Sequence, residues 1–334
     1  MDEALYGTRD RRGQYRPNAP LDVAPFWRRP VRARAILDWL PGYFLPWNLL
    51  FASSAVLYWW LAVPPVETMQ SFAPGWMLRL FLINAVLVAL FYGAFEWRLY
   101  LRRAQGDRFK FNPAFPADRP GRMFLFGSQN AECIFRTFTS GVTIWTLWEC
   151  LALWVFANGW GRWLDPADHW LWLCALALVV PVIHEAHFYA VHRLIHVPWL
   201  YRHVHAVHHR SVNPSPWSSL SMHPVEHLLY FATIAWHLIL PSHPVLALYQ
   251  LHVAGFGAIP GHVGFDRVEV GKDRAVDPHA YGHYLHHKFF EVNYGDGLVP
   301  LDRLFGTFHD GTEAADVAMR DRLRQRRAAS APAN

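Results

Sequence analysis

The sequence predicts an all-α integral membrane protein: a polytopic bundle of about four spans plus a re-entrant or interfacial hairpin, with a cytosolic histidine-rich cap. Three observations lead to this fold class. Hydrophobic residues make up 53% of the 334 residues and charged residues only 17%, a balance more typical of membrane than of soluble proteins. Four apolar runs are long enough to cross a bilayer, which takes about 20 residues. Histidine is confined to one part of the chain, because none of the 20 precedes His169.

The four apolar runs cover roughly residues 43–63, 76–97, 138–160 and 169–191. Tryptophan and tyrosine mark their ends, as is typical at the depth of the lipid headgroups. A further apolar stretch, roughly residues 228–258, is broken by "PSHP", and each of its arms is short for a span. We therefore expect a re-entrant hairpin or two interfacial helices that return to the side on which they begin.

The distribution of arginine predicts the orientation in the membrane. Arginines are frequent before the first span and after the second, whereas the connection between these spans has no lysine or arginine. The positive-inside rule then places the N-terminus, the loop after the second span and the segment after the fourth span in the cytoplasm. The predicted regions are a basic leader (1–40), a transmembrane region (41–183) with a cytoplasmic loop (98–137), a histidine-rich region (184–310) and a polar tail (311–334).

Charge and composition also bear on partners and location. The net charge is +5, which could indicate a nucleic acid partner. Because the arginines cluster beside apolar runs, they are more simply explained as topology signals, and we expect no nucleic acid. The preference for arginine over lysine favours a bacterial inner membrane over the endoplasmic reticulum.

The histidines occur in clusters with helical spacing. Two clusters have the pattern H-x-x-H-H, and residues at i, i+3 and i+4 lie on one face of a helix. Two further pairs are separated by four residues, and one histidine stands alone in "GHVGFD". In chain order the clusters are His192 and His196; His205, His208 and His209; His223 and His227; His262; and His283, His286 and His287.

This density of imidazole favours metal binding. Three histidines on one face repel when protonated, and they are costly to bury without a partner. Several such helices facing one another would supply eight or more nitrogen ligands, whereas one tetrahedral ion needs four. The sequence therefore predicts two metal ions. We leave open whether His184, His187, His227 and His279 also bind metal.

The motifs "HRLIH", "HAVHH", "HPVEH", "GHVGFD" and "HYLHHKFFEVNYGDGLVPLDRLFGTF" resemble, in this order, the fatty acid hydroxylase/sterol desaturase superfamily of integral membrane oxidoreductases. The resemblance covers about residues 185–308 and is closest to the C-5 sterol desaturase (lathosterol oxidase-like) members. It implies that residues 184–310 form a catalytic region around two Fe ions, which Zn can replace in purified protein, with O2 as co-substrate. The implied metal ligands are His192, His196, His205, His208, His209, His283, His286 and His287, with His223 and His262 at matching positions of the wider motif set.

Glu185 matches an acidic position of the family, and we predict that it supports catalysis by orienting a ligand. The implied function is O2-dependent desaturation of a membrane lipid, most simply a sterol-like one. The chain has no HPGG haem motif and no cysteine set for an iron–sulfur cluster, so a separate cytochrome or ferredoxin must deliver electrons.

Two other functions remain open. A lipid hydroxylase or monooxygenase, acting on a fatty acyl chain, a sterol methyl group or an ether lipid, would use the same ligands. A membrane metal transporter is a remote alternative, because a transporter places sparse polar ligands at mid-membrane depth. A catalytically inactive lipid-binding relative would have lost ligands, and the eight core histidines are all present.

Overall fold

The structure, a computed structural model, describes residues 1–116 and 122–329. Among these residues, four helices are long and apolar enough to cross a membrane: Ala33–Leu61, Pro74–Leu101, Gln129–Ala157 and Pro166–Ile195. They correspond to the four predicted spans. The described strands are only two or three residues long, so the predicted all-α membrane fold is confirmed.

Shorter helical segments joined end to end make up three of the spans. The first consists of α1 (Ala33–Tyr43), the π-helical turn η3 (Phe44–Asn48) and α2 (Leu49–Leu61); α3 (Val66–Met69) then leads into the second. The second consists of α4 (Pro74–Glu96) and η4 (Trp97–Leu101), and the third of α5 (Gln129–Arg136), η7 (Thr137–Gly141) and α6 (Val142–Ala157). The fourth is the single helix α7 (Pro166–Ile195).

Helix α4 shows why the spans need an apolar surrounding. Its buried residues repeat every fourth position along one face: Trp76, Leu80, Asn84, Val88, Tyr92 and Glu96. Leu82, Val86 and Leu90 are apolar as well, yet they are exposed. A helix that is apolar on all sides but packs along one stripe suits lipid, not water.

The broken apolar stretch forms a hairpin between the spans. Its first arm is α10 (Pro224–Phe231), the 3₁₀ turn η10 (Ala232–Ala235) and α11 (Trp236–Ile239), and its second arm is α12 (Pro244–Gly255). Helix α12 packs against α2, α6 and α7, and most of its residues are buried. The hairpin is therefore part of the bundle interior and leads back to the cap.

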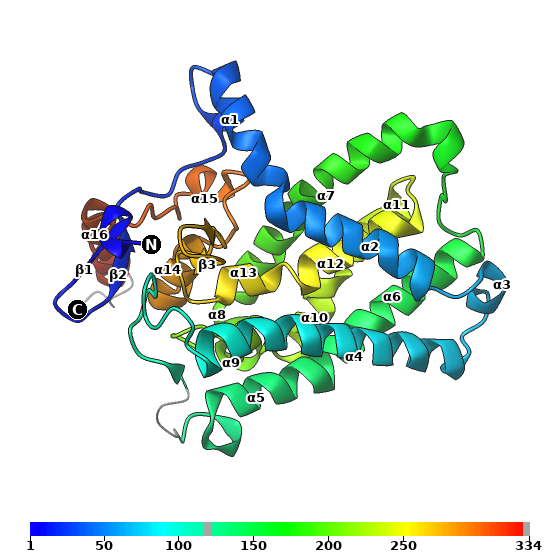
Figure 1. Ribbon diagram of the computed structural model, residues 1–334, viewed down its shortest axis with the longest axis horizontal. Coiled ribbons are helices and arrows are strands. Elements are labelled where there is room, and N and C mark those ends of the chain that lie inside the picture. Colours follow the sequence, from blue (N-terminus) through cyan, green and yellow to red (C-terminus); the bar gives the residue numbers. More distant parts are fainter. Residues whose placement is uncertain (117–121, 330–334) are drawn as a thin grey trace.

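Short elements build the cap. They are α8 (Pro198–Leu200), the π-helical turn η8 (Tyr201–His205), α9 (Ala206–His209), the 3₁₀ helix η9 (Pro216–Leu220), α13 (Ala258–His262), strands β3 (Val268–Glu269) and β4 (Ala275–Val276), α14 (Tyr281–Phe289), α15 (Leu301–Leu304) and α16 (Glu313–Ala329). In Figure 1 the N-terminus, α14, α15 and α16 gather at one end of the bundle and α3 lies at the other. The N-terminus and the histidine-bearing cap thus share one end, as the predicted topology requires.

The connections are shorter than we expected. The first helical span begins at Ala33, inside the predicted leader 1–40. The helix of the second span continues to Leu101 and that of the third begins at Gln129, so both helices extend into the predicted loop 98–137. Hydropathy marks only the apolar part of a helix, and these helices continue through polar and charged residues at their cap ends.

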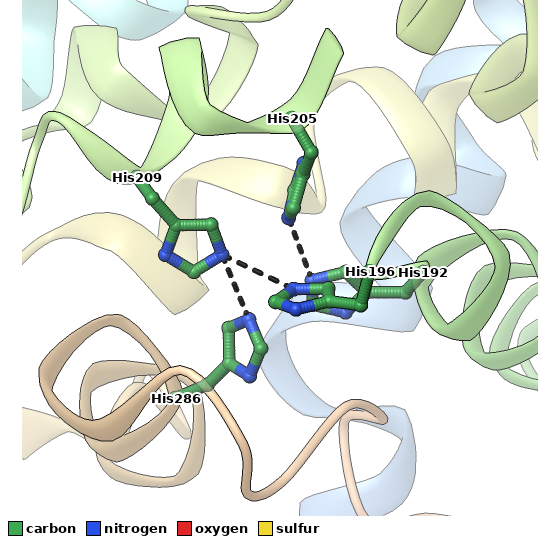
Figure 2. A group of neighbouring side chains, drawn as sticks. All are labelled: His192, His196, His205, His209 and His286. Carbon is green, nitrogen blue, oxygen red and sulfur yellow. Dashed lines mark hydrogen bonds between the residues drawn. The ribbon is translucent and has the colours of Figure 1, made fainter. Parts of the chain in front are cut away.

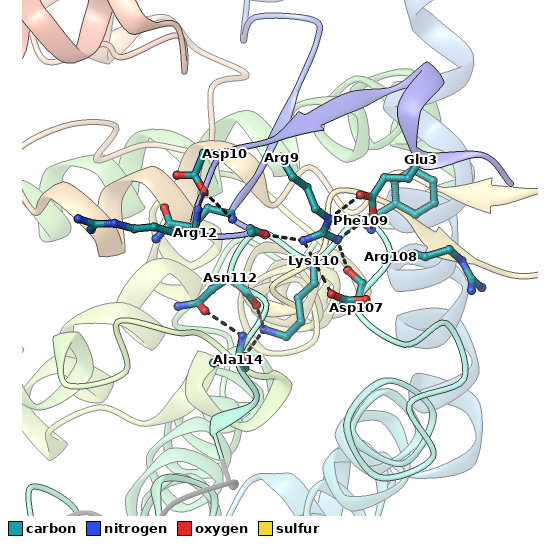
Figure 3. A network of polar contacts seen from close by, with 12 residues as sticks. Glu3, Arg9, Asp10, Arg12, Asp107, Arg108, Phe109, Lys110, Asn112 and Ala114 are labelled. Carbon is teal, nitrogen blue, oxygen red and sulfur yellow. Dashed lines mark hydrogen bonds and ion pairs between the residues drawn. The ribbon is translucent and has the colours of Figure 1, made fainter.

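The leader is folded against the cap. Strands β1 (Gly7–Arg9) and β2 (Tyr15–Pro17) form an antiparallel hairpin, flanked by the 3₁₀ turns η1 (Glu3–Leu5) and η2 (Pro25–Trp27); a further 3₁₀ turn, η6 (Leu125–Gly127), lies in the middle loop. Glu3 accepts hydrogen bonds from Arg9 and from the backbone N–H of Phe109, and Arg9 also donates to the carbonyl of Asp107 (Figure 3). Next to Phe109, the carbonyl of Phe111 accepts a hydrogen bond from the N–H of Tyr15 at 3.0 Å. The segment from Asp107 to Phe111 therefore links the leader to the rest of the cap.

Candidate metal centre

Four separate segments bring histidines to one place in the cap. The end of α7 supplies His192 and His196, and η8 with α9 supplies His205, His208 and His209. Helix α13 ends with His262, and α14 supplies His283, His286 and His287. Within the described residues, these nine side chains form two groups that could hold metal ions.

The first group, which we call the five-histidine group, contains His192, His196, His205, His209 and His286 (Figure 2). The second, the four-histidine group, contains His208, His262, His283 and His287. In each group the potential ligand atoms all lie within 4.8 Å of one another. The groups adjoin, since the ring centroids of His209 and His287 are 4.9 Å apart.

The Nε2 atoms point at one another in both groups. In the five-histidine group the Nε2–Nε2 distances are 3.2 Å for His192–His205, 3.2 Å for His196–His209 and 3.1 Å for His209–His286. In the four-histidine group they are 3.3 Å for His208–His262, 3.0 Å for His262–His283 and 3.1 Å for His283–His287. The Nε2 atoms of each group therefore converge on one point, which gives two such points in the centre.

Each H-x-x-H-H motif is divided between the groups. His205 and His209, four residues apart, join the five-histidine group, whereas His208 between them joins the other. In α14, His283 and His287 belong to the four-histidine group and His286 belongs to the five-histidine group. We expected all three histidines of each motif to face one site. The two groups instead lie next to each other along the same helix face, so each motif contributes to both.

Acceptors on the far side of several rings fix the tautomer. The Nδ1 atom of His192 donates to the carbonyl of Tyr294 at 2.7 Å, that of His286 to Val292 at 2.7 Å and that of His262 to Ala258 at 2.8 Å. A carbonyl can only accept, so each of these neutral rings carries its proton on Nδ1 and a lone pair on Nε2. Such outer contacts typically orient metal-binding histidines.

This donor set fits metal ions. Lone pairs that face one another at about 3 Å cannot all be satisfied by each other, and a cation between them would satisfy several at once. Neutral imidazole suits Fe, Zn, Cu and Ni. Nine such nitrogens exceed the need of one ion, and their division into two groups fits two ions.

Glu226 of α10 is a site residue that we did not predict. Its Oε1 atom lies 2.7 Å from Nδ1 of His205, and its side chain is buried. Burial raises the pKa of Glu226 well above its usual value and lowers that of His205, so without metal the contact joins neutral groups. A nearby metal ion would favour the carboxylate. The motif "HPVEH" contained this residue, but nothing in the spacing distinguished it from an ordinary helical glutamate.

Glu185, predicted to orient a ligand, contacts no ligand directly. Its Oε1 atom accepts a hydrogen bond from the N–H of Gly297 at 3.1 Å. In the same loop, the two Asp302 carboxylate oxygens accept from the N–H groups of Tyr294 and Gly295 at 3.0 and 2.9 Å. Glu185 and Asp302 together hold the loop whose Tyr294 carbonyl contacts His192. The link from Glu185 to a ligand is therefore indirect.

Burial keeps the imidazoles neutral. It lowers the pKa of His196 to about 2 and that of His262 to about 4. The pKa values of the other grouped histidines outside the spans are well below the usual value, first because of burial and then because neighbouring imidazoles disfavour a second charge. These residues are His205, His208, His209, His283, His286 and His287. Metal binding requires this neutral form.

The other histidines considered as ligands lie outside both groups. His223 is the N-cap of α10, where its Nδ1 accepts a hydrogen bond from the N–H of Val225 at 3.2 Å. His227 lies 3.1 Å from Ser140 Oγ, and His187 donates to the carbonyl of Leu229 at 2.9 Å. His184 is buried against Phe188 and Tyr230, and His279 is exposed.

Aromatic side chains close one side of the centre. The ring of Phe188, one helical turn before His192, lies 4.8 Å from the His192 ring and 6.2 Å from that of His283. Tyr230 of α10 packs edge-on to Phe188 at 5.9 Å. Phe188 thus packs against one histidine of each group, on the side of the centre that faces the membrane-spanning part of α7.

Comparisons with known proteins agree with the site. Residues 177–307 match the family model described as "Fatty acid hydroxylase". The Delta(7)-sterol 5(6)-desaturase ERG3B of Gibberella zeae is 28% identical over 141 residues, 41% of this chain and 43% of the relative. The very-long-chain aldehyde decarbonylase GL1-11 of Oryza sativa subsp. indica is 30% identical over 164 residues, 47% of this chain and 60% of the relative.

A third relative, the Delta(7)-sterol 5(6)-desaturase ERG3 of Saccharomyces cerevisiae, is 34% identical over 137 residues, 40% of this chain and 36% of the relative. The chain spans about half the length of the curated relatives it matches first. No solved structure matches it. The matched region contains all nine grouped histidines and the loop that holds His192. Residues 177–307 are therefore similar to the fatty acid hydroxylase family, and the chain is similar to the Delta(7)-sterol 5(6)-desaturases.

Proposed function

We propose that this protein is a membrane oxidoreductase that uses O2 and external electrons to desaturate a lipid at a centre of two iron ions. The observation that carries the proposal is the pair of adjoining histidine groups, with their Nε2 atoms converging on two points. The match of residues 177–307 to the fatty acid hydroxylase family supports the reaction class, O2-dependent oxidation of lipids. The same centre in a hydroxylase would give an alcohol in place of an alkene.

The nine histidines would hold the two ions, five around one and four around the other. Bound iron would supply the activation of O2 needed to remove hydrogen from an unactivated C–H bond. The protein fixes the ligand tautomers through Tyr294, Val292, Ala258 and Glu226. It excludes water, since eight of the nine ligands are buried. We propose Glu185 as a supporting residue that acts through the loop beside His192.

The position of Phe188 and Tyr230 supports a lipid substrate. Both lie between the histidine groups and the bundle, so a lipid from the membrane would meet apolar rings next to the ligands. Two of the relatives named above are described as Delta(7)-sterol 5(6)-desaturases. We therefore propose a sterol-like substrate. The alternative is hydroxylation of an acyl chain, a sterol methyl group or an ether lipid.

The fold disfavours a metal transporter. Eight of the nine grouped histidines lie outside the four candidate spans, and the ninth, His192, is in the last turn of α7. A transport pathway would need ligands near the middle of the bilayer. We further propose that the centre faces the cytoplasm, in a bacterial inner membrane, and that a cytochrome or ferredoxin delivers the electrons.

Metal analysis of purified protein tests the dimetal proposal. We expect about two ions per chain, iron or substituting zinc. His286→Ala removes a ligand of the five-histidine group and His208→Ala one of the four-histidine group, so each should lower the metal content and abolish turnover. His203→Ala is a matched control, because His203 is exposed and outside both groups. A single ion per chain that neither ligand variant affects would contradict the proposal.

Mass spectrometry of lipids from cells with and without the gene tests the reaction. Desaturation removes two hydrogens from the substrate and hydroxylation adds one oxygen, so the two products differ in mass. A lipid found only with the intact gene, and absent with His286→Ala, would identify both substrate and reaction.

A further inference from the structure

The five-histidine group approaches the surface at one point. Of the nine grouped histidines, His196 alone is partly exposed, while the four-histidine group is buried throughout. An electron that enters from outside therefore meets the centre most directly through the five-histidine group.

Two tyrosines surround this point. The ring of Tyr294 lies 4.8 Å from His196, 5.2 Å from His286 and 5.7 Å from His192, measured between centroids. The ring of Tyr201 lies 5.3 Å from that of His196 and 5.7 Å from that of His209. The Tyr201 ring also lies 6.2 Å from that of His205, so the two tyrosine rings between them contact all five histidines of the group.

An arginine covers the outer side of this arrangement. Tyr294 is itself buried, and the guanidinium carbon of Arg193 lies 4.5 Å from the centre of its ring. Arg193 is exposed, so one cation at the surface contacts an aromatic ring that packs against three of the grouped histidines. Arg202, also exposed, directly follows Tyr201. Two acidic groups act on Tyr294: Glu291, which is exposed, and Asp302, which is buried and accepts hydrogen bonds from backbone N–H groups. At the exposed surface the two arginines therefore outnumber Glu291.

We propose that this face, formed by Arg193, His196, Tyr201, Arg202 and Tyr294, docks an acidic one-electron carrier protein and passes its electrons to the five-histidine group through the Tyr294 ring. The inference rests on the proposed function, because only an O2-dependent reaction needs these electrons. In desaturation, O2 is reduced to two molecules of water by four electrons. Two electrons and two protons come from the substrate, two electrons come from two encounters with the carrier, and two protons come from solvent.

The experiment compares two sources of electrons. The holoenzyme is placed in nanodiscs of neutral phosphatidylcholine and driven either by a reduced plant-type [2Fe–2S] ferredoxin or by dithionite in a single turnover. With ferredoxin, Arg193→Glu should lower kcat/KM by about tenfold or more and flatten its dependence on salt, since steering by charge contributes about 10- to 1,000-fold to association. Single turnover with dithionite should be unchanged, and Arg193→Lys should retain most of the ferredoxin-driven rate.

Arg11→Glu provides the control, because Arg11 is an exposed arginine of the β1–β2 connection. An equal loss in Arg11→Glu would overturn the docking site, as would an equal loss of dithionite-driven turnover in Arg193→Glu. An effect of Arg193→Glu that appears only with anionic lipid would assign the face to headgroups instead of a carrier. If wild-type protein formed no O2-dependent product with dithionite, the proposed function itself would fail.

Discussion

Four of the grouped histidines make a second contact through Nδ1, and most of these contacts are to backbone carbonyls. His192, His262 and His286 each donate from Nδ1 to a carbonyl, and His205 contacts Glu226. A carbonyl cannot be changed by substitution without altering the chain itself. Glu226 is therefore the one of these four contacts that can be removed cleanly by mutation.

Glu226→Ala should weaken metal binding at the five-histidine group by about 10- to 100-fold, as is typical when a partner of a metal-binding histidine is lost. The alanine leaves Nδ1 of buried His205 without an acceptor. Glu226→Gln keeps an acceptor oxygen of similar shape and should retain most of the affinity. Competition with a chelator, followed by metal analysis, measures the change. Equal affinities in Glu226→Ala and wild type would show that the contact does not support the ligand.

The sequence could predict the grouped histidines better than the contacts that support them. All nine grouped histidines were expected: eight from their regular helical spacing, and His262, which stands alone in the sequence, from the family resemblance. His223 was expected too, although it caps α10 instead, since an N-cap histidine and a ligand are indistinguishable in "HPVEH". The Tyr294 carbonyl was not expected, because every residue has a carbonyl and only tertiary structure selects one.

The hairpin was predicted from its central prolines, but its depth was not. Helix α12 lies among three spans, and its close approach to α6 depends on Gly255. A β-carbon at this position would overlap the ring of Trp145, a fully buried side chain. The sequence does not show that Trp145 packs against Gly255, so the need for glycine at this position could not be predicted.

Gly255→Ala should destabilise the protein by about 1–3 kcal/mol, the usual range for overpacking a tight interior. Gly93→Ala in α4 is the matched control, because a β-carbon there meets nothing within 4 Å. Thermal unfolding in detergent should therefore show a lower Tm for Gly255→Ala and little change for Gly93→Ala. Equal Tm values for the two variants would mean that α6 and α12 can separate at no cost.

At the scale of the whole molecule, four spans, the hairpin and the cap could be predicted, and the side of the membrane on which the cap lies stays a prediction. The folded leader could not be predicted, because β1 and β2 are stabilised by contacts with residues about 100 positions away, such as that between Arg9 and the carbonyl of Asp107. Local sequence carries no signal for such pairs.

Acid should destabilise the metal-free protein. The folded state lowers the pKa values of the cap histidines, for example to about 4 for His262, so they stay neutral while the unfolded chain takes up protons below about pH 6.5. Stability conferred by neutral burial is therefore lost as the pH falls from about 6.5 towards 4. The Tm of metal-free protein should decrease between pH 7 and pH 5. A constant or rising Tm over this range would contradict the assignment of neutral buried imidazoles.

The division of each H-x-x-H-H motif between the two groups has a consequence for how the centre can fail. Helices α9 and α14 each contribute to both groups, because the middle histidine of each triplet, His208 or His286, lies in a different group from the other two. A rotation or slip of either helix by one residue would damage both metal positions together. Loss of one ion should therefore loosen the surroundings of the other, so that chains with one ion are rare and loading is close to all-or-none.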